Sequence, residues 1–194
     1  SNFDLEDDKY RHSELLTSTI KDILTQNNIS AKELSAVAIG IGPGSFTGLR
    51  IGFSVAKGLC YPHKINLIGI SSLKILANSI KADSGDIVSM INDKGNFFYL
   101  STFEDKLNEV GNPILEQVDP NFIKKYIKDG STIVVNSEDS FNYISTTIND
   151  QIKLINKSIS SINMIDLSYE SFLEKRFEDL AYCEPLYIKK PYVN

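Results

Sequence analysis

The sequence contains no tryptophan, only two histidines and only two cysteines among 194 residues, and these shortages exclude several kinds of site. Two cysteines do not make the disulfide framework of a small secreted domain, and neither Cys60 nor Cys183 has a metal-binding or redox spacing. No apolar stretch approaches the roughly 20 residues that a membrane-spanning helix needs. We therefore expect a cytoplasmic protein with two reduced thiols.

Basic residues are also in short supply, with 20 lysines and arginines against 25 aspartates and glutamates and a net charge of −5. That balance argues against autonomous binding to a nucleic-acid backbone, which generally needs a basic face. Residues 1–8 are acidic and lack the basic segment of a secretory signal, so we expect no such signal. The length and the 42% hydrophobic content fit one large domain or two small lobes with real cores.

Hydrophobic periodicity predicts alternating helices and strands in the first part of the chain. The predicted elements are helices over residues 9–26 and 71–80, a helix that follows a glycine turn and ends near residue 59, and strands over residues 35–41 and 65–70. The strands are uninterrupted apolar runs, which is typical of strands buried on both faces. Ser30 and Glu33 have the pattern of a capping box before a short helical turn. This alternation predicts a layered α/β domain.

A polar stretch at residues 81–86 predicts the boundary between a first lobe, residues 1–84, and a second lobe, residues 85–194. In the second lobe, residues 93–95 between two apolar runs predict a hairpin. The other predicted elements are strands over residues 87–92, 96–103 and 132–135 and helices over residues 120–128, 140–148 and 165–177. Residues 152–155 are apolar without fitting one element. The tail from Glu184 is expected to be extended, because proline disfavours helix in the residue before it.

The most informative segment is GIGPGSFTGLRIG at residues 40–52, which follows an apolar strand, turns tightly and enters a helix. The turn residues are Gly42, Pro43, Gly44 and Ser45. Its glycines can adopt positive φ and allow a backbone or a ligand to approach closely. Ser45 or Thr47 can cap the helix, and a helix N-terminus can bind an anion. No Gly-Lys-Ser/Thr follows, so this is not a Walker loop, and a plain turn and a phosphate loop both stay open.

The helix after the turn carries small residues at Gly48, Gly52 and Ala56, which are spaced by four and therefore share one face. Two interior glycines cost about 1 kcal/mol each relative to alanine, so we expect this face to allow the close approach of another helix. Two neighbours are compatible with it, the first helix of the same lobe and a helix of another subunit. Leu49 and Phe53 lie on the adjacent stripe, where they are available for the same contact.

The run GPGSFTGLRIG, followed by AKGL at residues 56–59, resembles the hallmark of the bacterial TsaB (YeaZ) family. The stretch RHSELL at residues 11–16 is similar to the first-helix motif of that family. IGISSL at residues 68–73 resembles its next strand and helix start, and EPLYI at residues 184–188 resembles its ending. The resemblance covers the first half of the chain well and the second half thinly.

The resemblance implies an α/β, actin-like fold of the sugar kinase, Hsp70 and RNase H-like type with two lobes. The family's first strand pair, with its Asp-Thr-Ser-like turn, is absent from this chain. The implied function is that of a non-catalytic subunit of the complex that makes N6-threonylcarbamoyladenosine at position 37 of tRNA. The implied partners are a TsaD-type catalytic subunit, a TsaE-type ATPase and, when alone, a second copy. We expect tRNA contact only through the complex, no membrane contact and no cofactor.

The same resemblance implies that TsaB-type and TsaD-type subunits pair through the first two helices of each. The expected interface residues are Leu15, Leu16, Gly48, Leu49, Gly52, Phe53, Ala56 and Leu59.

TsaD-type subunits bind a metal through His-x-x-x-His on the helix after the second of these strands, where this chain has Ser72 and Leu76. Neither side chain can replace an imidazole ligand. The only histidines, His12 and His63, lie far from metal-ligand spacing. We therefore expect no metal site and no catalytic residue on this chain, and we favour a partner subunit over an enzyme.

Two other functions stay open. A glycoprotease-like metal-dependent hydrolase needs a metal pair or a nucleophile with a base, and Ser45 with His12 is the only conceivable pair. An actin-like nucleotide-binding ATPase rests on fold analogy alone. The absent first turn also removes a phosphate-contacting element of such folds. Metal analysis of the purified protein tests the first of these functions, and calorimetry with ATP and ADP tests the second.

Overall fold

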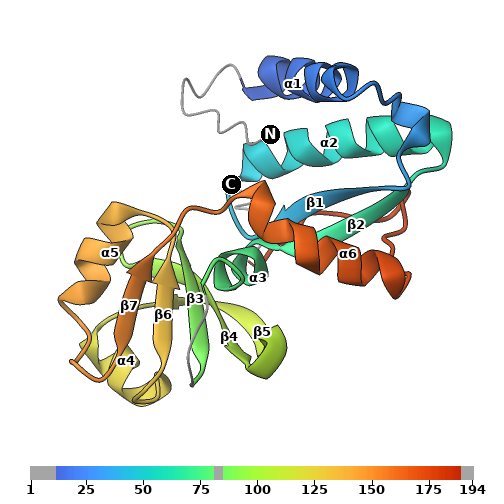
Figure 1. Cartoon of the computed structure of the whole chain (residues 1–194). Coiled ribbons are helices and arrows are strands. Elements are labelled where there is room, and N and C mark those ends of the chain that lie inside the picture. Colours follow the sequence, from blue (N-terminus) through green and yellow to red (C-terminus); the bar gives the residue numbers. More distant parts are fainter. Residues whose placement is uncertain (1–11, 81–84, 189–194) are drawn as a thin grey trace. The chain divides into compact units, whose positions relative to one another are not determined.

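A computed structural model of the chain describes residues 12–80 and 85–188 and divides them into two compact units (Figure 1). Among the described residues, the first unit comprises 12–41, 45–70 and 164–185, and the second comprises 42–44, 71–80, 85–163 and 186–188. This division differs from the predicted boundary at residue 84. Apart from the short segment 42–44, the chain enters the second unit at Ser71, returns to the first unit at Met164 and enters the second unit again at Leu186.

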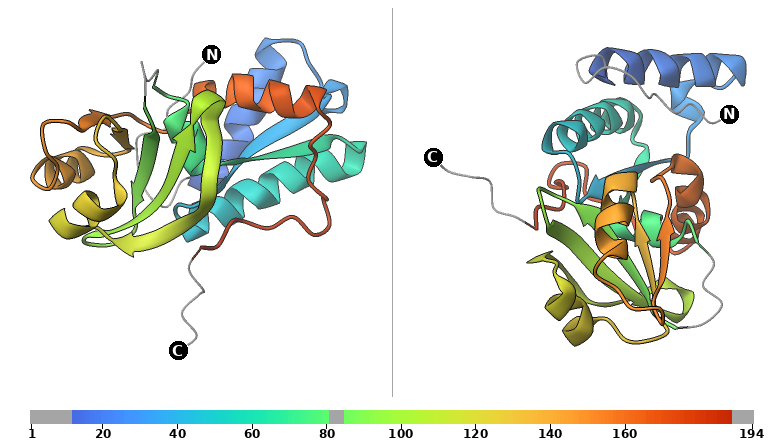
Figure 2. Two further views of the ribbon diagram at one scale, coloured as in Figure 1. Left: turned by 90° about the horizontal axis from the view of Figure 1, so that it is seen from below. Right: turned by 90° about the vertical axis from the view of Figure 1, so that its left-hand side faces the viewer.

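The first unit is a two-stranded sheet with helices on both faces. Its elements are α1 (His12–Gln26), the 3-10 turn η1 (Ala31–Glu33), β1 (Ala36–Gly42), α2 (Phe46–His63), β2 (Asn66–Ser71) and α6 (Ile165–Leu173). In the left view of Figure 2 the two strands run between α2 and α6. In Figure 1 and in the right view of Figure 2, α1 lies on the side of α2 that faces away from β1.

The elements predicted for the first unit are present. The Ser30 amide donates a hydrogen bond to the Glu33 carboxylate at 2.8 Å, as the capping-box pattern predicts. The second helix runs past its predicted end at residue 59 to His63, where Lys64 closes it in a left-handed conformation with φ 56°. The start of the first predicted helix, residues 9–11, lies outside the described residues.

The core of the first unit forms where α2 packs on β2. Ala56 and Cys60, one helical turn apart, belong to a buried cluster with Ile65 and Leu67. Cys183 packs against the same cluster, and both thiols are free. Burial, assisted by the nearby Cys183, raises the pKa of the Cys60 thiol above its ordinary value. The buried thiol is therefore protonated at neutral pH and a poor nucleophile.

The second unit is a five-stranded mixed sheet in the order β5-β4-β3-β6-β7. Strands β3, β4 and β5 are antiparallel neighbours, whereas β3, β6 and β7 pair in parallel. The elements are α3 (Ser72–Ala77), β3 (Ile87–Asn92), β4 (Phe97–Glu104), the 3-10 turn η2 (Asp105–Leu107), β5 (Asn108–Gln117), α4 (Pro120–Tyr126), β6 (Thr132–Val135), α5 (Glu138–Ser145), β7 (Lys153–Asn156) and the 3-10 turn η3 (Ser161–Met164), which ends at the unit boundary.

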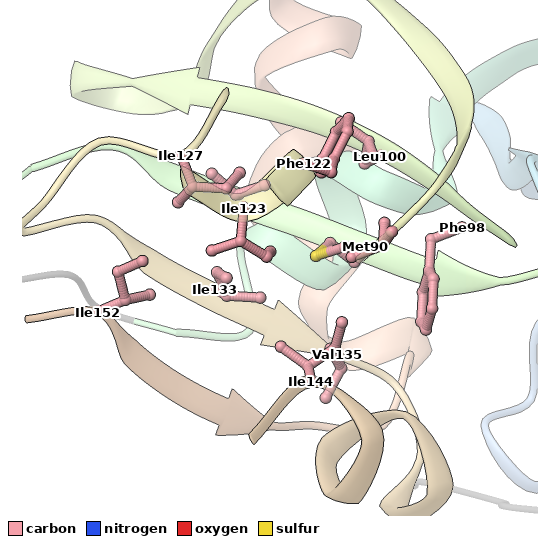
Figure 3. Packing of buried hydrophobic residues seen from close by; sticks show 12 residues of the cluster. Met90, Phe98, Leu100, Phe122, Ile123, Ile127, Ile133, Val135, Ile144 and Ile152 are labelled. Atoms are coloured by element: carbon pink, nitrogen blue, oxygen red, sulfur yellow. The ribbon is translucent and has the colours of Figure 1, made fainter. Parts of the chain in front are cut away.

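Helices cover both faces of this sheet. Successive residues of a strand point to opposite sides, so each strand can contribute to a core on either face. On one face, Met90 and Ile133 pack with residues of α4 and α5 in a large apolar cluster (Figure 3). On the other face, Ile91 and Phe103 pack with Leu73 and its neighbours in α3. Strands β3 and β6, with apolar residues on both sides, are therefore buried on both sides. Strand β1, whose apolar run predicts the same burial, is mostly half-buried.

The described part of the chain departs from prediction in three further features besides small shifts in the ends of helices. Residues 108–117 form the edge strand β5, which was not predicted. Residues 152–155, left unassigned by their pattern, overlap β7. The last helix ends at Leu173 and not at residue 177, because Lys175 adopts φ 56° and turns the chain.

No helix among the described residues is long and apolar enough to cross a membrane.

Candidate protein-interaction site

The glycine turn joins β1 to α2 and has the geometry of a capped turn. Gly42 adopts φ 105°, which glycine reaches without the strain that a side chain would bring. The Ser45 hydroxyl accepts a hydrogen bond from the Gly48 amide at 3.2 Å, so Ser45 caps α2. Gly42 and Pro43 are buried, whereas Gly44 and Ser45 are exposed. The helix start is therefore stabilised by the protein's own hydroxyl.

The row of small residues on α2 faces the interior of the first unit. A Cβ added to Gly52 would lie 3.6 Å from Cδ1 of Ile39 on β1. Ala56 and Phe53 are each only 5% exposed. The neighbour that the structure gives Gly52 is therefore strand β1, and contact of this row with another subunit stays a prediction. The small residues of this row let α2 lie close to the apolar strand β1. Of Gly48, Gly52 and Ala56, only Gly48 is exposed.

Substitutions at Gly52 test this position of the row. Gly52→Ala is expected to stabilise the first unit by about 1 kcal/mol, since alanine favours helix and its Cβ would make an ordinary contact. Gly52→Leu is expected to destabilise it by about 1–3 kcal/mol, because the longer side chain pushes against Ile39. Urea denaturation followed by circular dichroism measures both effects. A stable Gly52→Leu protein would show that the row is open after all.

The open surface of the first unit lies instead between α1 and α2, where a groove of about 660 Å³ separates the two helices. Its apolar side chains are Ile20, Leu24, Ile29 and Ala31 from α1 and the segment after it, and Val55 and Leu59 from α2. Ile29 is 42% exposed. A Cβ added to Gly58, in the α2 wall, would meet nothing within 4 Å. Thr17, Lys21, Thr25 and Ser54 add polar atoms to the walls.

The sequence matches a known family over nearly its whole length. Residues 6–191 match the TsaD family, described as tRNA N6-adenosine threonylcarbamoyltransferase. The chain belongs to this family.

Within the TsaD family, the chain is similar to proteins named tRNA threonylcarbamoyladenosine biosynthesis protein TsaB. The Escherichia coli K12 protein is 38% identical over 74 residues, which are 38% of this chain and 32% of that protein. The Bacillus subtilis protein is 30% identical over 113 residues, which are 58% of this chain and 47% of that protein. The chain thus spans a third to a half of the length of these curated relatives.

The solved structure of YeaZ from Pseudomonas aeruginosa has the same fold. It superposes with a TM-score of 0.76 over 92% of this chain and 84% of that chain, at 17% sequence identity. Together these similarities identify the chain as a TsaB (YeaZ) member with the α/β, actin-like fold of the TsaD family.

In this TsaB member, the structure brings together only part of the predicted interface. Leu59 lines the groove, and Leu15, Leu16 and Leu49 are half-buried. The groove residues that the prediction missed are Ile20, Leu24, Ile29, Val55 and Gly58. Ile20 and Leu24 share the apolar side of the first helix at helical spacing, and Gly58 is a third glycine of the second helix. Those two signals in the sequence could have found Ile20, Leu24 and Gly58.

The positions that correspond to metal ligands in TsaD-type subunits are not open to a ligand. Ser72 and Leu76 lie in α3 and are 8% and 0% exposed. Leu76 belongs to the apolar core of the second unit. Within residues 12–80 and 85–188, no three His, Cys, Asp or Glu residues gather closely enough to hold a metal ion. His63 is exposed in the last turn of α2, and the side chain of His12 lies outside what the structure describes.

Proposed function

We propose that the chain acts in the synthesis of threonylcarbamoyladenosine on tRNA as a non-catalytic, TsaB-type subunit that binds a TsaD-type catalytic subunit. The family and the names of the curated relatives support the pathway. The observation that carries the binding role is the open apolar groove between α1 and α2. A TsaE-type ATPase joins the pair in this proposal, and a second copy occupies the groove when the chain is alone.

The groove has the composition of a protein-binding surface. Ile20, Leu24 and Val55, which are half-buried, line it with apolar side chains, and Thr17 and Lys21, which are exposed, add polar groups. An apolar centre with a polar rim is the usual arrangement of a protein interface. A pair of helices with a groove between them accepts a further helix, whose apolar side chains fill the groove. The bare backbone at Gly58 allows such a helix to approach closely.

The absence of a catalytic role in this proposal rests on residue types and charge. Ser72 and Leu76 provide no imidazole, and both are buried in α3. The net charge of −5 does not favour direct binding of a polyanion. In the proposed complex, the partner therefore supplies the metal ligands and most of the contact with tRNA.

The test fills the groove without disturbing the fold. Gly58→Leu adds a side chain where nothing lies within 4 Å, and leucine favours helix more than glycine does. We expect Gly58→Leu to weaken binding to the TsaD-type subunit of the same organism at least tenfold, measured by calorimetry. Self-association in size-exclusion chromatography should fall as well.

The matched control for this variant is Asn142→Leu, which adds the same side chain at an exposed position of α5 in the second unit. It should leave binding and self-association unchanged. Equal affinity of the wild-type chain and Gly58→Leu for the TsaD-type subunit would remove the groove from the proposal. Absence of any binding by the wild-type chain would remove the partner role itself.

A further inference from the structure

The outer face of α6 carries an exposed apolar row. Ile165, Tyr169 and Leu173 follow one another at intervals of four residues, so they lie along one side of the helix. Their exposed fractions are 59%, 63% and 62%. Leu167 and Ser171, on the opposite side of the helix, are buried. The row therefore does not contribute to the core of its own unit.

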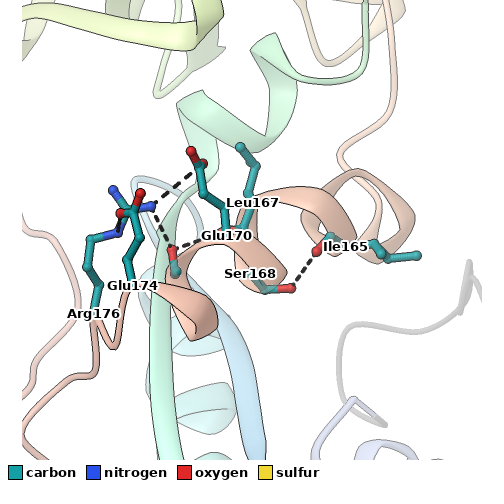
Figure 4. A network of polar contacts seen from close by, with 7 residues as sticks. Ile165, Leu167, Ser168, Glu170, Glu174 and Arg176 are labelled. Atoms are coloured by element: carbon teal, nitrogen blue, oxygen red, sulfur yellow. Dashed lines mark hydrogen bonds and ion pairs between the residues drawn. The ribbon is translucent and has the colours of Figure 1, made fainter.

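An acidic row runs beside the apolar one. Asp166, Glu170 and Glu174 each follow one residue after a member of the apolar row, so they share its spacing. Arg176 contacts Glu170 at 3.6 Å and Glu174 at 3.1 Å (Figure 4). One guanidinium thus faces two of three carboxylates, and the helix itself contains no basic residue in its last turn. The flank keeps an excess of negative charge.

We propose that this face of α6 docks an amphipathic helix of another protein, one whose apolar row is flanked by lysine or arginine. The apolar row spans eight residue steps, which is about 12 Å or two helical turns, a length that a second helix can match. A basic flank on that helix would lie against the acidic row, and opposite charges at the edge of such a contact select the partner.

A second copy of this chain fits the face poorly. The α6 helix of a second copy would contain no lysine or arginine and could not supply a basic flank. If a two-fold axis crosses the two helices, they run antiparallel and place like flanks against each other. The acidic row of one copy would then face the acidic row of the other, which is unfavourable. The face also lies across the strands from α2, so its occupant does not compete with one in the groove (Figure 2). The inference is therefore independent of the proposed function.

The experiment uses the whole chain and two designed helical peptides with the same apolar row, one flanked by lysine and the other by glutamate. In fluorescence anisotropy titrations, we expect the lysine-flanked peptide to bind at least tenfold more tightly than the glutamate-flanked one. The difference should shrink in high salt, because exposed charges are screened. Tyr169→Ser should weaken the binding of the lysine-flanked peptide at least tenfold.

Two controls locate the binding. Tyr182→Ser removes a tyrosine that is 82% exposed in the same unit but outside α6, and it should not change the affinity. Gly58→Leu should also leave it unchanged, which separates this face from the groove. The double variant Asp166→Lys with Glu170→Lys should reverse the preference in favour of the glutamate-flanked peptide, with circular dichroism to confirm the fold.

The proposal is overturned if both peptides bind equally, or if Tyr169→Ser leaves the affinity for the lysine-flanked peptide intact. It is also overturned if the chain forms a dimer that Tyr169→Ser abolishes, since the occupant would then be a second copy.

Discussion

Phe103→Ala is expected to lower the free energy of unfolding of the second unit by about 3–5 kcal/mol, the usual cost of removing a fully buried phenyl ring. Phe103 is 0% exposed on β4 and lies in register with Ile87 of β3. It packs in the cluster between the sheet and α3. Since α3 provides much of the cover for that face of the sheet, the cavity left by the ring weakens the attachment of the helix as well.

The matched control is Phe97→Ala, which removes the same ring from the start of the same strand. Phe97 is 43% exposed, so its loss should cost about 1 kcal/mol or less. Urea denaturation measures both variants, and amide hydrogen exchange locates the effect in β3 and β4. Similar destabilisation by the two variants would mean that the face of the sheet toward α3 is not a packed core.

The buried strands could be predicted because their sequences carry a strong pattern. Residues 87–92 and 132–135 were predicted at the bounds they have in β3 and β6. Both strands are apolar on both sides and covered by helices. The hairpin at residues 93–95 could also be predicted, because these turn residues lie between two apolar runs. In the structure Gly95 adopts φ 57°, and the Asn92 side-chain amide donates a hydrogen bond to the Gly95 carbonyl at 2.8 Å.

Strand β5 could not be predicted in this way. Nearly every one of its ten residues is exposed, so no alternation of apolar and polar residues marks it. It contains Gly111 and Pro113, which read as turn or loop residues. Its position comes from backbone pairing with β4, where Phe98 lies opposite Glu116. An edge strand of this kind is determined by its neighbour, and the local sequence does not reveal it.

The candidate interface shows a similar limit. The spacing of Gly48, Gly52 and Ala56 correctly indicates one smooth face, but spacing cannot say what lies against that face. In the structure strand β1 lies against this face, and Ile39 lies beside Gly52. The face left open is the one toward α1, marked by Val55, Leu59 and the bare Gly58. The helical period shows which residues share a face of the helix. Which of these faces stays open to a partner depends on how the helix packs in the folded unit.

Gly85→Ala is expected to destabilise the second unit by about 3 kcal/mol, the sum of a steric clash and a left-handed backbone. Gly85 adopts φ 80°, and an added Cβ would lie 2.5 Å from the carbonyl oxygen of Gly130. That oxygen cannot easily move. The Gly130 amide donates to the Gln151 carbonyl at 3.1 Å, and the Thr132 amide donates to the Asp86 carbonyl at 2.9 Å. The clash thus falls where β3 and β6 begin to pair.

Gly95→Ala separates the two causes. Gly95 has φ 57°, but an added Cβ would meet nothing within 4 Å, so only the backbone strain remains. We expect it to cost about 1–2 kcal/mol, clearly less than Gly85→Ala. Urea titrations of the two variants and the wild-type chain give the difference, which isolates the contact with Gly130. If Gly85→Ala proves no more costly than Gly95→Ala, the start of β6 must yield to a methyl group, and the pairing of β3 with β6 is looser than its hydrogen bonds indicate.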